Sequence, residues 1–306
     1  MREFEKNIRK VEPYVPGEQP QKKVIKLNTN ENPYPPAPGV LAAMKKLEGH
    51  VDSLRLYPDP TSDTLVSALA DFYHVGKDQV FVGVGSDDVL IKEDYYPENG
   101  GVIFPNPNAP TSIYEDLEFV EDIIRHNQDV IVIVDEAYID FAGESALSLL
   151  DKYDNLIITQ TFSKARSMAG MRIGYAIASP LLIKYLNDAK YSFNSYTMNK
   201  TSLVYGAEAV KDKEYFAETT RKIVETRDWA EEEFKKLGFV FPKPSANFIF
   251  VSHPEYDAKE LFEAMKAKGI YVRFWGSERI EQYLRVTIGT REEMEALFAF
   301  LREYMM

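Results

Sequence analysis

The stretch LIITQTFSKARSMAGMRIGY (residues 156–175) decides how the rest of this 306-residue chain is interpreted. Its first residues are apolar and β-branched, which is typical of a buried strand, and residues 172–177 form a second strand-like run. Lys164 closely follows the first strand, so we expect its amine at the rim of a sheet, facing a cleft. Ser163 and Arg172 could supply a hydroxyl and a guanidinium to one phosphate group. Taken alone, the same pattern fits a lysine and an arginine on a surface loop.

Composition limits the classes of function. The chain has 45% hydrophobic and 27% charged residues, which is ordinary for a globular protein, and its length suggests about two domains. A formal net charge of −12 argues against nucleic acid or an anionic membrane as a partner. Cysteine is absent and the four histidines form no ligand-spaced pair, so we expect no disulfide and no metal site. We also expect no membrane-spanning segment and no N-terminal signal sequence.

Apolar strands alternate with helices from about residue 61 to residue 177, which predicts a parallel α/β sheet. Strand-like runs at 79–84, 101–104 and 129–134 precede the one at 156–159. In such sheets ligands bind beyond the carboxyl ends of the strands. The polar residues that follow these strands are Asn108, Asp135, Tyr138, Ser163 and Lys164. Their convergence at one edge is the main prediction from the residues themselves.

The rest of the chain predicts a second, smaller unit. A long amphipathic helix at about 215–237 is followed by strands and helices that suggest an α+β domain. We therefore divide the chain into an N-terminal arm with part of the small domain (1–45), a large cofactor-binding domain (46–195), and a linking helix with the C-terminal small domain (196–306).

The residues at the predicted edge match what pyridoxal 5'-phosphate (PLP) requires. Asp135 could keep the pyridine nitrogen protonated, although the same residue would also fit an exposed helix cap. Tyr138 could hydrogen-bond the phenolic oxygen of the cofactor. Lys164 could bind its aldehyde carbon and move the proton of the substrate.

Six segments carry a family resemblance: LNTNENPYPP (27–36), RLYPDP (55–60), NPNAPTS (106–112), VDEAYIDF (134–141), TFSKARSMAGMRIGY (161–175) and YLRVTIGT (283–290). Together they resemble the histidinol-phosphate aminotransferases, within the fold-type I PLP-dependent aminotransferases. The resemblance implies an α/β fold with a large domain, whose mostly parallel central sheet is flanked by helices, and a smaller α+β domain. It also implies a cytoplasmic homodimer that converts L-histidinol phosphate and 2-oxoglutarate to imidazole-acetol phosphate and L-glutamate in histidine biosynthesis.

The resemblance also implies roles for individual residues. Lys164 matches the Schiff-base lysine, Asp135 the partner of the pyridine nitrogen, and Tyr138 the ligand of the phenolic oxygen. The further cofactor ligands that it implies are Tyr57, Gly85, Ser86, Asp87, Asn108, Ser163 and Arg172, with Tyr57 reaching the phosphate of the neighbouring subunit. The substrate-binding residues that it implies are Tyr34, Asn194, Arg273 and Arg285.

Two departures from the family pattern stand out. Ala109 occupies the position where the family has an asparagine before Pro-Thr, and Asn108 could substitute for it. Only residues 89–100 separate two segments that the family separates by roughly fifty more residues, enough for about two further βα units. The missing segment would include inner strands of the sheet and the aromatic ring that stacks on the cofactor. Either the deletion is real and weakens cofactor binding, or residues are missing from the sequence as written, or other elements fill the sheet.

Alternative functions follow from the same residues. Arg285 would bind a carboxylate as readily as a phosphate, so an aromatic amino-acid aminotransferase is the nearest alternative. A decarboxylase of phosphorylated threonine would use much the same cofactor set. From a different class, a catalytically impaired scaffold without the stacking segment also fits.

Overall fold

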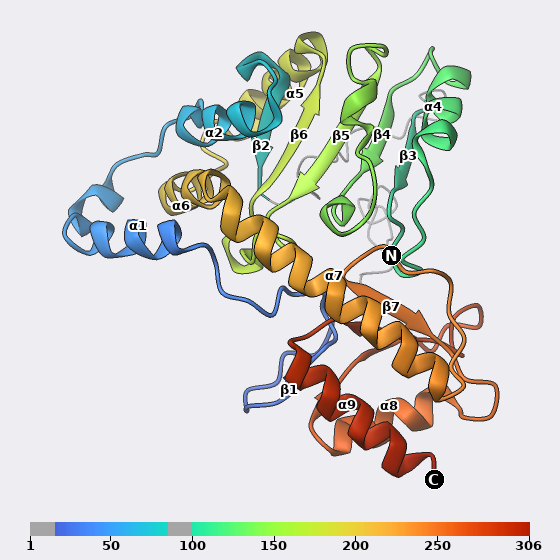
Figure 1. The fold of residues 1–306 in the computed structure, drawn as a ribbon. Coiled ribbons are helices and arrows are strands. Elements are labelled where there is room, and N and C mark those ends of the chain that lie inside the picture. The colour runs from blue at the N-terminus through green and yellow to red at the C-terminus, as the bar shows by residue number, and fades with distance from the viewer. Residues whose placement is uncertain (1–15, 85–99) are drawn as a thin grey trace, which may run out of the picture.

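The computed structural model describes residues 16–84 and 100–306 of the chain (Figure 1). Its helices are α1 (Pro38–Glu48), α2 (Asp63–Tyr73), α4 (Leu117–His126), α5 (Pro180–Phe193), α6 (Lys200–Lys211), α7 (Lys213–Lys236), α8 (Ala258–Ala267) and α9 (Arg291–Tyr304). Its strands are β1 (Ile25–Lys26), β2 (Val80–Gly83), β3 (Val102–Pro105), β4 (Val132–Asp135), β5 (Leu156–Thr161), β6 (Gly174–Ala178), β7 (Phe248–Val251), β8 (Ile270–Tyr271), β9 (Arg273–Phe274) and β10 (Leu284–Thr287).

The largest sheet has the strand order β2-β6-β5-β4-β3. Strands β3, β4 and β5 pair in parallel, and β6 is antiparallel to both β2 and β5. The sheet is thus mixed, with only β6 opposed to the other four described strands, as the mostly parallel α/β prediction requires. These described strands pair without interruption, so the sheet has no gap between neighbouring strands in the described part of the chain. Strand β2 lies at one edge of this sheet, and β3, the next described strand along the chain, lies at the other edge. The short segment 89–100 falls between these two strands in the sequence.

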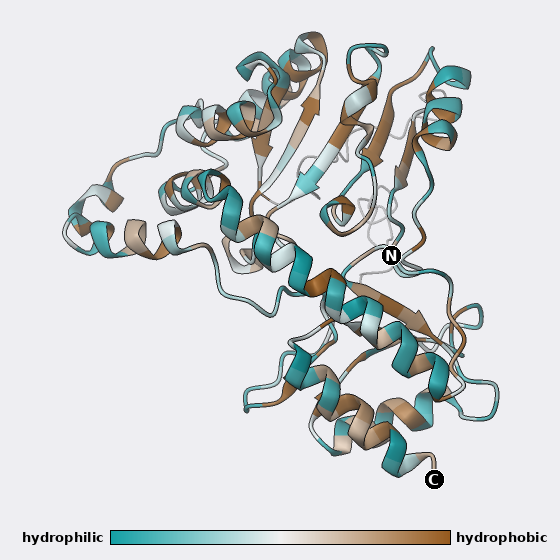
Figure 2. Cartoon of the chain, viewed as in Figure 1, coloured by the Kyte–Doolittle hydropathy of each residue, from teal (hydrophilic) through white to brown (hydrophobic). Residues whose placement is uncertain are grey.

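Strand β5 lies in the middle of this sheet and is buried along its whole length. Leu156 and Ile158 pack against α4, whereas Ile157 packs against α5 on the opposite face. A strand that is covered on both faces has no polar alternation, which is why its sequence forms a continuous apolar run. Figure 2 shows that β5 becomes hydrophilic toward its carboxyl end, where Thr159, Gln160 and Thr161 lie.

A second body of structure is formed by the C-terminal part of the chain together with β1. Strands β7, β10 and β9 form an antiparallel sheet, and β1 pairs in parallel with β8. The main apolar core here joins Leu27 to side chains of β7, β10 and α9. Helix α7, 24 residues long, runs from the large sheet to this part (Figure 1). The chain after β1 therefore leads from the smaller sheet toward the large one.

The start of helix α2 is capped by a carboxylate that lies upstream of the cap position. Ser62 occupies the cap position, but its side chain makes no capping hydrogen bond. Instead, Asp59 accepts hydrogen bonds from the N–H groups of Thr61 and Asp63, both at 2.9 Å. A carboxylate upstream satisfies the free amides at this helix start as well as a hydroxyl would.

Among the described helices, none combines the length and the apolar character that a membrane span requires.

Candidate active site

A cavity of about 390 Å³ lies at the carboxyl ends of β4 and β5. Its size falls within the range of roughly 300–1,000 Å³ that is usual for small-molecule sites. Five of the residues predicted from the sequence line it together: Asp135, Tyr138, Ser163, Lys164 and Arg172. The other lining residues are Thr29, Glu31, Pro105, Ala109, Ala137, Thr161 and Ala169.

Lys164 reaches this cavity from the turn that follows β5. Its Nζ donates a hydrogen bond to the carbonyl oxygen of Thr29 at 3.2 Å and lies 5.7 Å from the ring centroid of Tyr138. The turn is closed by the N–H of Met168, which donates to the carbonyl of Phe162 at 3.0 Å. Phe162 itself is fully buried in the core. The backbone is therefore fixed, and the flexible lysine side chain delivers the amine to the cavity.

Ser163 and Arg172 form a polar pair in the wall of the cavity. The Oγ of Ser163 accepts hydrogen bonds from Thr161 Oγ1 at 3.0 Å and from Arg172 Nη1 at 3.5 Å. Arg172 adopts a left-handed backbone conformation (φ 51°) directly after the short helix Ala169–Met171. A guanidinium beside a hydroxyl presents several donors in one direction, which suits a phosphate group.

Asp135 ends strand β4 and faces the cavity, opposite Thr159 of β5 in the sheet register. Its Oδ1 accepts hydrogen bonds from the N–H of Ala137 at 3.0 Å and from Thr159 Oγ1 at 3.4 Å. These contacts orient the carboxylate on the short turn between β4 and Tyr138.

Glu136 points to the opposite side of the same turn and was missed by the sequence analysis. It is buried and accepts hydrogen bonds from Ser145 Oγ and the N–H of Ala146, both at 2.6 Å, and from Gln160 Nε2 at 2.9 Å. Burial raises the pKa of Glu136 to about 7, although these three donors oppose the shift. Successive side chains along an extended chain face opposite sides, so an acid next to Asp135 could have been expected behind the site.

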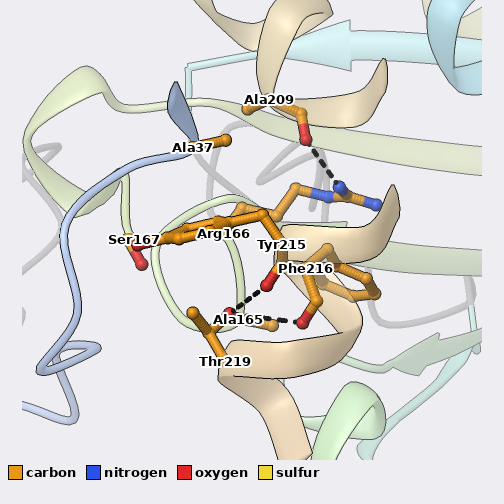
Figure 3. A pocket seen from close by; sticks show the side chains of 8 residues that line it. All are labelled: Ala37, Ala165, Arg166, Ser167, Ala209, Tyr215, Phe216 and Thr219. Atoms are coloured by element: carbon orange, nitrogen blue, oxygen red, sulfur yellow. Dashed lines mark hydrogen bonds between the residues drawn. The ribbon is translucent and has the colours of Figure 1, made fainter. Parts of the chain in front are cut away.

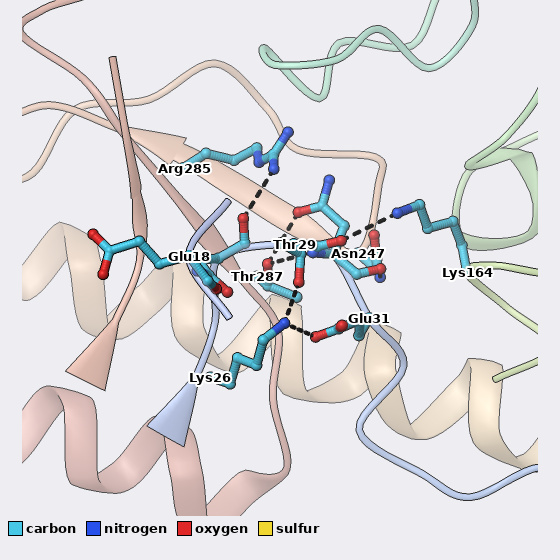
Figure 4. Close-up of polar contacts among 10 residues, drawn as sticks. Glu18, Lys26, Thr29, Glu31, Lys164, Asn247, Arg285 and Thr287 are labelled. Atoms are coloured by element: carbon cyan, nitrogen blue, oxygen red, sulfur yellow. Dashed lines mark hydrogen bonds and ion pairs between the residues drawn. The ribbon is translucent and has the colours of Figure 1, made fainter. Parts of the chain in front are cut away.

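The segment 28–31 lies between the two parts of the fold and touches several predicted residues (Figure 4). The carbonyl of Asn28 accepts a hydrogen bond from Arg285 Nη2 at 3.2 Å, and that of Thr29 accepts the bond from Lys164. Glu31 forms an ion pair with Lys26. The sequence analysis used this segment only as a motif and assigned no role to its individual residues.

Arg273 and Arg285 lie directly opposite each other on the antiparallel strands β9 and β10. Each guanidinium carbon lies 5.1 Å from the ring centroid of Trp275. The Trp275 ring thus holds both guanidinium groups through cation–π contacts. Neither arginine lines the cavity, but Arg285 and Lys164 reach the same segment 28–31 (Figure 4).

The remaining predicted residues lie away from the cavity or outside the described residues. Asn108 accepts a hydrogen bond from Thr111 Oγ1 at 2.8 Å within its own turn, and its neighbour Ala109 lines the cavity instead. The others that do not line it are Tyr34, Asn194 and Tyr57. Gly85, Ser86 and Asp87 are outside the described residues.

Tyr34 and Asn194 have local contacts that explain their positions. The ring of Tyr34 packs against the core of the smaller body, and burial raises the pKa of its hydroxyl. Asn194 is exposed at the end of α5, where its Oδ1 accepts a hydrogen bond from the N–H of Tyr196 at 3.2 Å. Their proposed contact with substrate stays a prediction.

A second, small cavity of about 10 Å³ is lined by Ala165, Arg166 and Ser167, which follow Lys164 in the turn (Figure 3). Here the buried guanidinium of Arg166 lies over the rings of Phe72 and Phe216 and donates to the carbonyl of Ala209 at 3.2 Å. The space suffices for about one water molecule. The cavity is too small to hold a ligand of its own. The contacts of Arg166 support the turn that carries Lys164.

The groups around the larger cavity fit PLP. A carboxylate, an amine and a phosphate-binding pair occur on neighbouring strand ends, and Tyr138 adds a phenol. Tyr138 is also the only aromatic residue among those that line the cavity in the described part of the chain. The stacking aromatic ring that the resemblance implies is thus not among the described residues that line the cavity. Within the same residues no group of acidic and histidine side chains could hold a metal ion.

Comparison with known proteins gives consistent matches along the whole chain. The sequence profile of "Aminotransferase class I and II" matches residues 22–92 and 88–301. Histidinol-phosphate aminotransferases from Clostridium botulinum (strain Okra / Type B1) and Clostridium acetobutylicum are each 43% identical, covering 96% and 98% of both chains, respectively. The crystal structure of the histidinol-phosphate aminotransferase from Sinorhizobium meliloti in complex with PLP is 24% identical and has a TM-score of 0.80, covering 93% of this chain and 92% of that one.

The alignments also bear on the short segment. The Clostridium botulinum alignment spans 343 residues, more than the 306 of this chain, so part of that relative has no counterpart here. The two matched stretches of the family profile meet at residues 88–92. This chain is therefore shorter than its relatives near residues 88–92, close to the place where the motif spacing predicted a missing segment.

Proposed function

This chain belongs to the class I and II aminotransferases, and from that premise we propose that it transfers the amino group of L-histidinol phosphate to 2-oxoglutarate with PLP as its cofactor. The products are imidazole-acetol phosphate and L-glutamate, in a step of histidine biosynthesis. The observation that carries the proposal is the arrangement of Lys164, Asp135 and the Ser163–Arg172 pair around one cavity. The names and the identity of the curated relatives support the choice of substrate.

Each residue of the cavity has a defined task in this proposal. PLP supplies an electron sink that stabilises negative charge at the reacting carbon of the amino donor. Ser163 and Arg172 would hold its phosphate, Asp135 would lie at its pyridine nitrogen, and Tyr138 would donate to its phenolic oxygen. Lys164 would hold the aldehyde carbon and, when its amine is free, carry a proton at Nζ.

Arg273 and Arg285 would bind the anionic end of the substrate. Arg285 contacts the segment 28–31, which also contacts Lys164, and Arg273 lies opposite Arg285 in the sheet register. This arrangement supports a substrate that extends from the cavity toward the smaller sheet. A fork-shaped guanidinium binds either a phosphate or a carboxylate through paired hydrogen bonds. The same pair would therefore serve both the phosphorylated donor and the 2-oxo acid.

Replacing Arg285 by leucine is expected to raise KM for L-histidinol phosphate about 100-fold, because hydrogen bonds to a charged group are lost. PLP content should be unchanged, since Arg285 does not line the cofactor cavity. Arg285→Lys keeps the charge without the fork and should give an intermediate KM. The assay compares L-histidinol phosphate, L-histidinol and L-phenylalanine as amino donors. If the wild-type enzyme has a higher kcat/KM for L-phenylalanine than for L-histidinol phosphate, the chain is instead an aromatic amino-acid aminotransferase.

A homodimer is part of the proposal, because Tyr57 does not line the cavity of its own chain yet matches a cofactor residue. Its side chain is 80% exposed and stacks on Tyr196 with 4.5 Å between ring centroids. Large apolar side chains are also exposed near these two tyrosines in the sequence: Leu41, Val51, Leu54 and Leu56 precede Tyr57, and Phe193 precedes Tyr196. Such a surface is typical of an interface between subunits. The net charge of −12 supports the absence of a nucleic-acid partner, and we place the enzyme in the cytoplasm with its small-molecule substrates.

Mixing two inactive variants tests the shared site. Dimers of Lys164→Ala lack the amine, and dimers of Tyr57→Ala lack the tyrosine in both sites. After random exchange of subunits, half of the dimers are mixed and each has one intact site, so activity should recover to about a quarter of the wild-type value. Sedimentation at micromolar concentration checks the assembly. A monomer, or a mixture no more active than its components, would contradict the shared site.

A further inference from the structure

We propose that Asn30 is a positioning residue for Tyr138, and that Thr287 orients the amide of Asn30 for this task. The inference rests on the proposed function, in which Tyr138 donates to the phenolic oxygen of PLP, and deepens it. It starts from one contact that bridges the two parts of the fold: Asn30 Nδ2 donates a hydrogen bond to Tyr138 Oη at 2.9 Å.

The direction of the Asn30 amide is set by its neighbours. Thr287 Oγ1 accepts a hydrogen bond from the backbone N–H of Asn30 at 3.0 Å, so its own proton is available for Asn30 Oδ1, also at 3.0 Å. With the amide oxygen turned to Thr287, the amide nitrogen faces Tyr138. Asn30 is only 1% exposed and Thr287 2%, so no bulk water replaces a lost partner.

The backbone of Asn30 is held as firmly as its side chain. Its φ of 55° lies in the left-handed region, which asparagine adopts more readily than most residues. Its carbonyl accepts a hydrogen bond from Asn247 Nδ2 at 3.1 Å, and Asn247 is fully buried. Figure 4 shows Thr287 and Asn247 beside this segment. The amide is thus fixed before any ligand arrives.

A fixed donor on the oxygen of Tyr138 determines where the proton of Tyr138 goes. An amide N–H can only donate, so the phenol oxygen accepts from Asn30 and its single proton must be donated elsewhere. Tyr138 lines the cavity, and its ring is held edge-on against Phe248 with 5.1 Å between centroids. The geometry therefore directs the proton of Tyr138 toward a ligand oxygen in the cavity.

The same contacts connect the cofactor site to the strand of the substrate arginine. Thr287 follows Arg285 by two residues in β10, and both contact the segment 28–31. The strand that would bind the substrate anion thereby also sets the hydrogen-bond direction at Tyr138.

The test measures PLP affinity and the pH dependence of the visible spectrum of bound PLP. Asn30→Asp keeps the shape but replaces the donor by an acceptor, which would take the proton of Tyr138. We expect PLP to bind about tenfold more weakly, and the pH midpoint of the spectrum to move in the same direction as in Tyr138→Phe. In a Tyr138→Phe background, Asn30→Asp should weaken PLP binding by less than about twofold, because coupled residues are not additive.

Thr287 provides the second, milder pair of variants. Thr287→Val removes the hydroxyl and should lower PLP affinity in the same direction as Asn30→Asp, whereas Thr287→Ser retains the hydroxyl and should match the wild type. This pair decides the question if Asn30→Asp does not fold. Thermal unfolding of each apoprotein separates a loss of positioning from a loss of stability.

The possible failures are distinguishable. Wild-type PLP affinity and spectrum in both Asn30→Asp and Thr287→Val, with altered values in Tyr138→Phe, would overturn the positioning role alone. Additive losses in the double variant would do the same. If Tyr138→Phe also has the wild-type affinity and spectrum, the proposed role of Tyr138 fails and this inference with it.

Discussion

Replacing Lys164 by alanine is expected to lower kcat/KM for amino transfer at least about 10,000-fold, since both covalent binding of the cofactor and proton transfer depend on its amine. Lys164 carries the only amine among the described residues that line the cavity. The fold should survive, because among the described residues the amine makes a hydrogen bond only to the carbonyl of Thr29, and such a bond contributes about 1 kcal/mol. The measurement is the steady-state rate together with the circular dichroism spectrum and Tm.

Lys164→Arg is the matched control for charge. Arginine keeps the positive charge at the same position but stays protonated, so it can neither bind an aldehyde nor accept a proton at neutral pH. We expect it to be as inactive as Lys164→Ala while also retaining the fold. Wild-type turnover in either variant would refute the assignment of Lys164, and an intact fold with no activity would support it.

Local sequence patterns predicted the positions of Asp135, Ser163 and Lys164 well. Each lies at the end of an apolar run that forms a strand. Neighbouring parallel strands have their carboxyl ends at the same edge of the sheet, independently of the rest of the fold. The β5 run was recognisable because both of its faces are covered by helices. The predicted α/β fold is confirmed for the same reason, since alternating strands and helices leave few other arrangements.

Contacts between distant segments could not be predicted in this way. Asn30 meets Tyr138 across 108 residues and Thr287 across 257, and no short-range pattern encodes such a meeting. Helix α4 begins at Leu117, because Asp116 caps it by accepting a hydrogen bond from the N–H of Phe119 at 3.0 Å. Residues before it are held by Asn106, whose Oδ1 accepts from the N–H of Glu115 at 2.9 Å.

Replacing Asp135 by asparagine is expected to reduce kcat about 100- to 1,000-fold, as does loss of one preorganised charge-stabilising group in other enzymes. Asparagine has the same shape, and its amide oxygen can still accept from the N–H of Ala137 and from Thr159. What it lacks is the negative charge that would keep the pyridine nitrogen of PLP protonated. The variant should therefore retain its Tm while losing turnover and PLP affinity.

The neighbouring carboxyl group gives the control. Glu136→Gln changes an acid that faces away from the cavity and accepts three hydrogen bonds, so one donor would meet an amide N–H after the change. Leaving a buried donor unpaired costs about 1–3 kcal/mol, which should lower Tm while turnover at low temperature stays close to wild type. Asp135→Asn thus reports the effect of the negative charge on turnover, whereas Glu136→Gln reports the effect of a buried hydrogen-bond network on stability. Wild-type kcat in Asp135→Asn would mean that this carboxylate serves only the turn after β4, and that the cofactor ring does not face it.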